Sequence, residues 1–374
     1  MSEESQKEIL LKFTDQIKVG LTGNLAGYML VNADGELVSG AQVDYNGSPT
    51  GYTSDPQEVI NYISAHDNET LFDAIQYKAP RDASMEERVR MQNLGLSLVA
   101  LGQGVPFFHA GSELLRSKSF DRDSYDSGDW FNRLDYIYQS NNYGVGLPPA
   151  DKNSSNWQLM RQLLRLPELV PSQQHILATR DHFEEMLAIR KSSPLFRLQT
   201  GQQVIDRLVF HNNGPDQIPG LIVMSISDSA EENLDPNYDL IVVLFNAAVE
   251  TVEFSLTDLQ DAALSLHPLQ ATSLDPVVAA STFNAETKTF SVPGRTTAVF
   301  VGAGSLFTTP EITPEAEASP TPEPAVQPTT VSPTQTPQTP AEAPAGQSLL
   351  PWLIALGGGG ILALVLWLYR RKSA

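Results

Sequence analysis

The sequence of 374 residues contains no cysteine. This excludes disulfide bonds, zinc sites with thiolate ligands and a thiol nucleophile. Basic residues are also scarce, since 24 Lys and Arg stand against 44 Asp and Glu for a net charge of −20. Because nucleic-acid binding needs a basic face, we expect no nucleic-acid partner. The first residues, Met1–Ser5, are polar and acidic, with neither the basic nor the apolar part of a signal peptide.

One long apolar segment does occur, near the end of the chain. Residues Leu349–Tyr369 are interrupted only by small residues and one proline, and roughly 20 residues of this kind suffice to cross a bilayer. Trp352 and Trp367 lie near its ends, basic residues 370–372 follow, and residues 308–348 contain no Lys or Arg. By the positive-inside rule we expect a transmembrane helix in the cell membrane rather than a buried core helix, with the bulk extracellular and the short tail cytoplasmic.

The two ends of the chain conflict, because an extracellular bulk needs an export signal that the first residues do not supply. We therefore expect the sequence to be truncated upstream of Met1. Residues 307–348 are rich in Pro, Thr, Ala and Glu and hold ten of the 26 prolines. This composition predicts a disordered, extended stalk. With a span at residues 349–369 and a basic tail at residues 370–374, the layout predicts a surface-tethered protein.

Residues 1–195 are typical of an α/β domain, beginning with a helix up to about Gly20. In Asn61–Asp73, an apolar segment runs into the polar cluster His66-Asp67-Asn68-Glu69. Ser84–Glu87 is a capping box that opens a helix, and Val105–Ala110 indicates a second buried strand. Strand, helix and strand in this order predict a parallel pair.

The polar cluster at the end of the first strand has two interpretations. Catalytic groups of barrel enzymes emerge at the carboxyl ends of strands, where this cluster lies. Alternatively, Asp67 or Asn68 satisfies backbone donors in a capped loop. The residues alone leave both open.

A long connection and a helix follow the second strand. Residues 111–156 are polar and rich in Tyr, Trp and Phe. A connection of this length predicts a functional loop, and its aromatic content argues against disorder. The amphipathic pattern of His175–Ser192 predicts a helix that closes the α/β part.

Residues 196–306 switch to short alternating apolar runs separated by turns, which predicts an all-β sandwich. The predicted strands are Val204–Phe210, Leu221–Ser227, Leu240–Asn246, Thr251–Leu256, Thr287–Val292 and Thr297–Val301. No His or carboxylate cluster with metal-ligand spacing occurs in this segment. We expect it to give structural support, with no metal and no cofactor in the protein.

Three long strings carry a resemblance that covers roughly residues 10 to 305. The strings N-Y-I-S-A-H-D-N-E-T-L-F-D, G-V-P-F-F-H-A-G-S-E-L-L-R-S-K-S-F-D-R-D-S-Y-D-S-G-D-W-F-N-R-L-D and S-S-P-L-F-R-L closely resemble pullulanases and limit dextrinases. These are debranching members of the α-amylase superfamily of glycoside hydrolases. The resemblance implies that Val59–Ala65 and Val105–Ala110 are the seventh and eighth strands of a (β/α)₈ TIM barrel. Residues 196–306 would be the C-terminal β-sandwich domain of the family.

The resemblance also implies roles for residues of the first polar cluster. Asp67 matches the carboxylate that stabilises the transition state, and His66 matches a histidine that hydrogen-bonds the same sugar. Such a carboxylate favours the oxocarbenium-like charge near the anomeric carbon. Asn68 is included as a substrate-binding residue.

Further substrate contacts are implied in the long loop. Asp129 and Arg133 match a pair that contacts glucose on the glycone side, and Trp130 is a stacking or loop-packing residue. Glu113 and Arg116 are expected to be structural ion-pair members rather than catalytic. The implied partner is a branched α-glucan such as pullulan, limit dextrin or amylopectin.

The sequence departs from the family in one essential respect. Retaining glycosidases need a nucleophile and an acid/base, which in this family lie on the fourth and fifth strands. Both would lie upstream of Met1, so we expect the chain to be inactive alone and its activity to require an N-terminal half encoded upstream. The alternatives are a non-catalytic, membrane-anchored α-glucan-binding protein and one half of a split enzyme.

Overall fold

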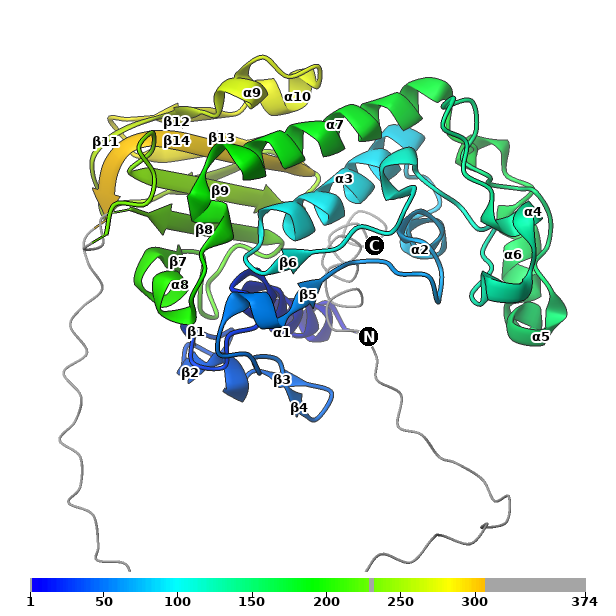
Figure 1. Cartoon of the computed structure of the whole chain (residues 1–374), viewed down its shortest axis with the longest axis horizontal. Helices are drawn as coiled ribbons and strands as arrows, with labels where there is room; N and C mark the ends of the chain where they lie inside the picture. Colours follow the sequence, from blue (N-terminus) through cyan, green and yellow to red (C-terminus); the bar gives the residue numbers. More distant parts are fainter. Residues whose placement is uncertain (1, 229–231, 307–374) are drawn as a thin grey trace, which may run out of the picture. The chain divides into compact units, whose positions relative to one another are not determined.

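A computed structural model describes residues 2–228 and 232–306, which are drawn in colour in Figure 1. The predicted stalk, membrane span and tail at residues 307–374 lie outside the described residues. Within the described ranges, no helix has both the length and the apolar character needed to cross a membrane.

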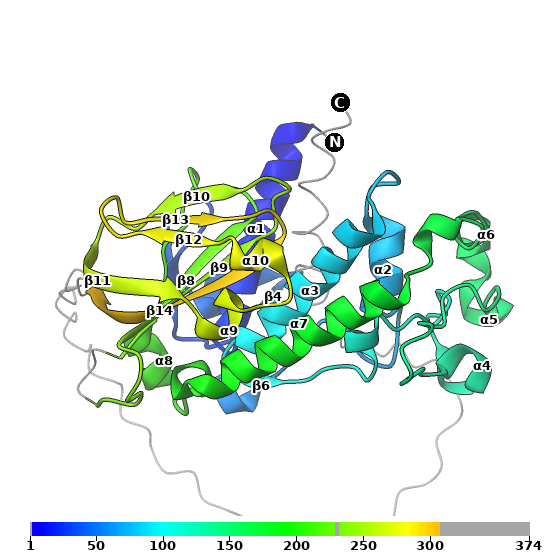
Figure 2. The same ribbon diagram turned by 90° about the horizontal axis from the view of Figure 1, so that it is seen from above.

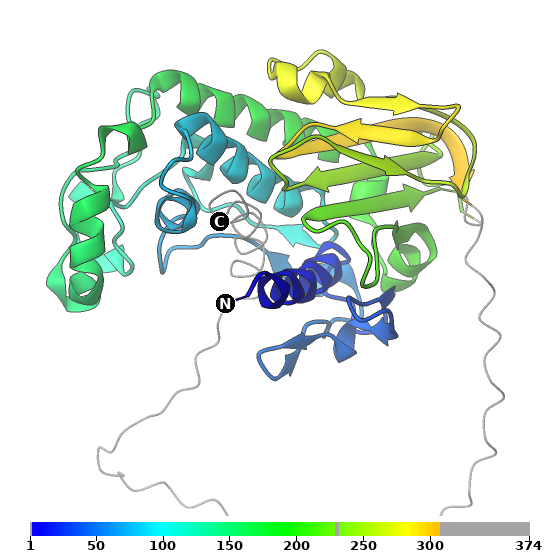
Figure 3. The ribbon, with the colours of Figure 1, turned by 180° about the vertical axis from the view of Figure 1, so that it is seen from behind.

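The chain begins with the predicted helix, α1 (Glu3–Leu21), whose cap residue Ser2 accepts a hydrogen bond from the backbone of Ser5. Its buried side, which includes Leu10 and Ile17, belongs to the main hydrophobic core. Two small antiparallel pairs follow and are seen beside α1 from behind in Figure 3. They are β1 (Met29–Val31) with β2 (Leu37–Ser39), and β3 (Asp44–Tyr45) with β4 (Ser48–Pro49).

The predicted strand–helix–strand unit is present. Strands β5 (Ile60–Asn61) and β6 (Val105–Pro106) pair in parallel and are joined through α2 (Leu71–Lys78) and α3 (Met85–Leu101). Ser84 caps α3 in the predicted capping box with Glu87. Each strand is only 2 residues long, shorter than predicted, because the two form a two-stranded sheet in which each has a single neighbour.

The two faces of the β5–β6 sheet differ in their surroundings. On one face Ile63 and Phe108 pack against the main core, and Phe108 contacts a phenylalanine of α7 edge to face. On the other face Ile60 is 58 % exposed, its partner Val105 is 41 % exposed, and Phe107 is 46 % exposed. This second face is therefore apolar and open.

The connection after β6 is ordered, as its aromatic residues predicted. It contains the short helices α4 (Asp129–Asn132), α5 (Ala150–Asn153) and α6 (Trp157–Leu163). A separate core holds it together, built from aromatic and aliphatic side chains that include Phe72, Phe120 and Tyr143. The loop thus has its own apolar anchor next to α2.

Helix α7 (Gln173–Ser192) is present as predicted and runs beside α3 (Figure 2). One strand prediction after it is wrong in part. Residues Gly201–Arg207 form helix α8, because Thr200 caps the helix by accepting a bond from the backbone of Gln203. Only Leu208–Phe210 remains as strand β7.

The rest of the described chain forms two antiparallel sheets. A five-stranded sheet has the order β11-β14-β9-β8-β7, and a three-stranded sheet has the order β10-β13-β12. The strands are β8 (Leu221–Ser227), β9 (Leu240–Asn246), β10 (Val252–Ser255), β11 (Leu259–Leu266), β12 (Thr282–Asn284), β13 (Thr289–Val292) and β14 (Thr296–Leu306). The short helices α9 (Pro268–Ala271) and α10 (Pro276–Ala279) lie between β11 and β12.

The central strands β8 and β9 are buried on both faces rather than alternating between core and solvent. On one side Ile222 and Met224 join the main core beneath the helices, and on the other Leu221 and Val223 pack with the three-stranded sheet. Continuous burial of this kind fits their predominantly apolar sequences, in which Ser225, Ser227 and Asn246 are the polar residues. The main core includes residues from both sides of the predicted domain boundary between residues 195 and 196. That boundary therefore stays a prediction.

Candidate functional site

An open cleft of about 320 Å³ lies at the carboxyl ends of β5 and β6. It is lined by His66, Asp67, His109, Arg116, Asp123, Ser124, Tyr125 and Asn132. Two residues of the predicted site, His66 and Asp67, are thus brought together with a histidine and an arginine from the second strand and its loop. The other predicted residues do not line the cleft.

The turn after β5 presents His66 and Asp67 to solvent, and Asn68 is exposed beside them. Asn68 has a φ of 60°, a left-handed conformation that asparagine tolerates better than most residues. Its Oδ1 accepts a hydrogen bond from Arg122 at 3.3 Å, and Arg122 also forms an ion pair with Glu69. Asn68 therefore shapes the turn by holding Arg122.

His109, which the sequence interpretation missed, lies across from this turn. Its Nε2 accepts a hydrogen bond from Arg116 at 3.1 Å, so the ring proton is on Nδ1, which donates to the Ser64 hydroxyl at 3.2 Å. Burial, followed by the charges of Arg116 and Lys118, lowers the pKa of His109 to about 4. The imidazole is neutral at pH 7, and its position at the end of the second predicted strand was the signal that could have identified it.

The expectation for Glu113 and Arg116 needs a correction. Neither takes part in an ion pair among the residues that the structure describes. Glu113 instead accepts from the backbone of Gly111 at 3.1 Å, and Arg116 binds His109 and the carbonyl of Ala110. Arg116 belongs to the cleft because its guanidinium reaches across the loop to the strand end.

Asp129, Trp130 and Arg133 lie on or next to α4 and are exposed outside the cleft lining. No ion pair in the described ranges joins Asp129 to Arg133. The indole N–H of Trp130 donates to the carbonyl of Val145 at 2.8 Å, which fixes the ring while leaving the residue 65 % exposed. Trp130 can therefore offer a flat apolar face to a ligand.

Asn132 ties α4 to the cleft wall. Its Oδ1 accepts from the hydroxyl of Ser124 at 2.9 Å, and its Nδ2 donates to the carbonyls of Ser124 and Gly128. These bonds hold Ser124 at the edge of the cleft, next to the exposed ring of Tyr125.

The chemistry of the cleft suits an uncharged ligand with many hydroxyls. Carboxylates, neutral imidazole, guanidinium, hydroxyl and amide groups can donate to or accept from such a ligand. Across residues 2–228 and 232–306, no three His, Asp or Glu side chains are grouped so that they could hold a metal ion.

Comparison with known proteins places the chain beside pullulanases. Residues 138–303 match the family described as "Alpha-1,6-glucosidases, pullulanase-type, C-terminal". The chloroplastic pullulanase 1 of Arabidopsis thaliana is 50 % identical over 306 residues, which cover 80 % of this chain and 32 % of that protein. A pullulanase of Klebsiella pneumoniae is 44 % identical over 289 residues, covering 76 % of this chain and 26 % of that protein.

Solved structures agree with the sequence comparison. The crystal structure of PulA from Klebsiella oxytoca has a TM-score of 0.75 at 39 % identity and covers 80 % of this chain and 29 % of that chain. Klebsiella pneumoniae pullulanase complexed with maltotriose has a TM-score of 0.73 at 40 % identity, again over 80 % of this chain and 29 % of that chain. The chain thus spans about a third or less of these relatives, and it carries a pullulanase-type α-1,6-glucosidase C-terminal region.

Proposed function

We propose that this chain is the C-terminal portion of an enzyme that debranches pullulan, limit dextrins or similar α-glucans. The enzyme hydrolyses α-1,6-glucosidic bonds with retention of configuration. The observation that carries the proposal is the cleft itself, because a carboxylate and hydrogen-bonding side chains gather at the carboxyl ends of a parallel strand pair. Its support is the similarity to pullulanases over 80 % of the chain.

In this proposal β5 and β6 are the seventh and eighth strands of a TIM barrel, and Asp67 stabilises the transition state. His66 hydrogen-bonds the same sugar, while the exposed Asp129 and Arg133 contact glucose one or two units along the chain. Asn68 supports the site through Arg122 rather than by touching sugar.

The open apolar face of the β5–β6 sheet supports a barrel that is completed by further strands. Ile60, Val105 and Phe107 expose 41–58 % of their surface on that face, where burial of apolar area would stabilise the assembly. Next to this face, burial followed by the negative charge of Asp67 raises the pKa of Tyr62. We propose that the added strands carry the nucleophile and the acid/base.

Fusion to the proposed further strands tests this proposal. The full chain would be joined to the part of Klebsiella pneumoniae pullulanase that precedes its matched region. We expect release of reducing ends from pullulan by the fusion and none by the chain alone. A fusion that unfolds cooperatively on heating yet leaves pullulan intact would contradict the proposal. Activity on mixing the two pieces unfused would favour a split enzyme.

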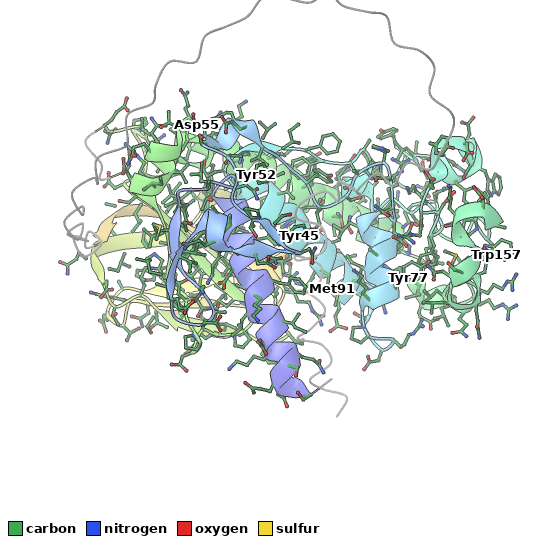
Figure 4. The ribbon with its side chains drawn as sticks, turned by 90° about the horizontal axis from the view of Figure 1, so that it is seen from below. Tyr45, Tyr52, Asp55, Tyr77, Met91 and Trp157 are labelled. Carbon is green, nitrogen blue, oxygen red and sulfur yellow. The ribbon has the colours of Figure 1, made fainter. Side chains whose placement is uncertain are left out.

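An α-glucan-binding protein without catalysis is the second candidate, and Trp130 favours it. An exposed indole ring with a fixed edge can stack on a sugar face at little entropic cost. We expect the chain alone to be retarded in a native gel that contains amylopectin, and Trp130→Ala to lose most of this retardation. Unchanged retardation in Trp130→Ala would remove the ring from the binding surface; Trp157→Ala, whose indole donates to the carbonyl of Pro148 outside the cleft, is the control (Figure 4).

We also propose that the chain is anchored in the cell membrane through Leu349–Tyr369, with its bulk extracellular and its tail cytoplasmic. The apolar run and the basic residues after it support this orientation. The full chain should stay in a carbonate-washed membrane pellet, whereas a chain ending at residue 348 should move to the supernatant. Release of the full chain by carbonate would refute the anchor.

A further inference from the structure

A buried lysine, Lys118, holds the turn that carries His66 and Asp67. The ammonium of Lys118 donates to the backbone carbonyl of His66 at 2.8 Å. Lys118 has no exposed surface, whereas His66 and Asp67 are both exposed. A lysine is rarely buried, since its charge must be compensated where water is excluded. Here the buried ammonium binds the backbone of the turn whose side chains line the cleft.

Asp73 fixes the segment from which Lys118 projects. This buried carboxylate accepts hydrogen bonds from the Ser117 hydroxyl at 2.5 Å, from the Lys118 backbone N–H at 2.8 Å and from the Phe120 backbone N–H at 3.2 Å. Asp73 itself lies in the first turn of α2, where its own backbone N–H donates to the capping Thr70. The bonds therefore join the start of α2 to residues 117–120.

The backbone of the joined segment is strained. Ser119 has a φ of 51° and Phe120 a φ of 70°, so two consecutive residues with side chains are left-handed. Such residues cost free energy and persist only where their surroundings hold them. The bonds of Asp73 hold this segment, and the same segment leads on to Asp123 and Ser124 in the opposite wall of the cleft.

We propose that Lys118 and Asp73 are positioning residues that set the His66–Asp67 turn against the opposite wall of the cleft. Lys118 fixes the direction of the His66 carbonyl and hence the following peptide, from which the Asp67 side chain extends. Asp73 fixes Lys118. The proposal rests on the proposed function in so far as His66 and Asp67 bind sugar, but the ordering of the turn can be measured without it.

Two substitutions in the full chain, compared with a matched control, test the proposal. Lys118→Met keeps the length of the side chain and removes the donor, and Asp73→Asn removes the charge of the anchor. The control is Lys18→Met, because Lys18 is equally buried and its ammonium also donates to a backbone carbonyl, that of Asn212, outside the cleft lining. Each variant is followed by thermal unfolding, by backbone amide NMR and by maltotriose titration.

Lys118→Met and Asp73→Asn are expected to shift and broaden the amide signals of residues 65–69 and to weaken maltotriose binding by about tenfold. Lys18→Met is expected to lower the unfolding temperature while leaving both readouts unchanged. Sharp, unshifted signals of this turn in the two variants would overturn the proposal. If Lys118→Met does not fold, Asp73→Asn decides alone.

Wild-type behaviour separates the two levels of the proposal. If the wild-type chain binds no maltotriose but the turn loses order in the two variants, the positioning role stands and the sugar-binding role of this surface fails. If the wild type binds maltotriose and the variants bind it equally well, the positioning role fails and the sugar-binding role stands.

Discussion

Asp67→Asn in the completed enzyme is expected to lower kcat/KM for pullulan by about 10²–10³-fold. Asparagine keeps the size of the side chain and one accepting oxygen but removes the charge. An oxocarbenium-like transition state develops positive charge that the bound substrate lacks. A carboxylate therefore interacts more strongly with the transition state than with the substrate, whereas a neutral amide does not. The loss should therefore appear in kcat, with KM changed little. Pullulan hydrolysis by the fusion described above provides the measurement.

Asp123→Asn is the matched control for this prediction, because Asp123 is the other carboxylate that lines the cleft. It lies 3.9 Å from the ammonium of Lys152, a contact between partly exposed groups that contributes little. We expect Asp123→Asn to change kcat/KM by less than about tenfold. Equal losses for the two variants would mean that the cleft needs only negative charge, and full activity of Asp67→Asn would refute its role.

The parallel strand pair could be predicted because its signals are local. Ser84 and Glu87 form their capping box within one turn, and apolar residues predominate in the segments at residues 59–65 and 105–110 that form the two strands. The strand lengths could not be predicted, because strand length depends on neighbouring strands. Val105–Ala110 has the composition of a full strand, yet with a single neighbour only Val105–Pro106 forms one.

In residues 196–306, two elements could not be predicted from residue preferences alone. β11 was missed because its sequence interrupts apolar residues with Gln260 and Asp261, and its pairing with β14 contains an irregularity between Gln260 and Ala263. Val204 was assigned to a strand on its own preference, whereas the Thr200 cap three residues from Gln203 selects a helix. Capping outweighed strand propensity here.

Within the site, the resemblance assigned sugar-binding roles to His66 and Asp67, but it assigned none to His109 and Arg116, although both lie in the second of the three strings. His66 and Asp67 were identified and do line the cleft. The contact of His109 with Ser64 depends on the pairing of β5 with β6, and Arg116 reaches the cleft through its hydrogen bond to His109. The role of Lys118 depends on burial, which the sequence Ser117-Lys118-Ser119 does not indicate.

The second large effect that we expect is a loss of stability in mild acid, because four of the six histidines are held neutral. Burial is the main cause that lowers the pKa of each to about 4: His109, His182, His211 and His267. In the unfolded chain these side chains bind a proton near pH 6.5. Their contribution to stability is therefore complete above pH 6.5 and is lost as the pH falls toward 4.

Buried carboxyls act in the opposite direction. Burial raises the pKa of Asp15 and of Asp73 to about 6, and it raises the pKa of Glu185 less. Their folded forms take up protons below pH 6, before the unfolded chain does, which favours folding in acid. At pH 5 the four histidines oppose the two aspartates, and these six groups together leave about two more protons on the unfolded chain than on the folded chain.

A difference of two protons corresponds to about 3 kcal/mol of unfolding free energy per pH unit. We expect about half of this, because solvent reaches His109, His182 and His211 in part and weakens the effect. Urea unfolding at pH 7 and pH 5 measures the difference. His182→Gln and His211→Gln should each reduce it, since glutamine can hydrogen-bond but takes up no proton in this range.

Asp15→Asn should act with the opposite sign. Asp15 accepts from the backbone of Ala33 and lies 3.8 Å from the ammonium of Lys18, and asparagine retains the first of these contacts. Because the variant loses a group that takes up a proton in the folded state, its stability should fall more steeply between pH 6 and 5 than that of the wild type. If the unfolding free energy of the histidine variants and of Asp15→Asn falls with pH as steeply as that of the wild type, neither set of buried groups governs the acid response. Opposite changes would assign that response to burial, since burial alone shifts histidine and carboxyl pKa values in opposite directions.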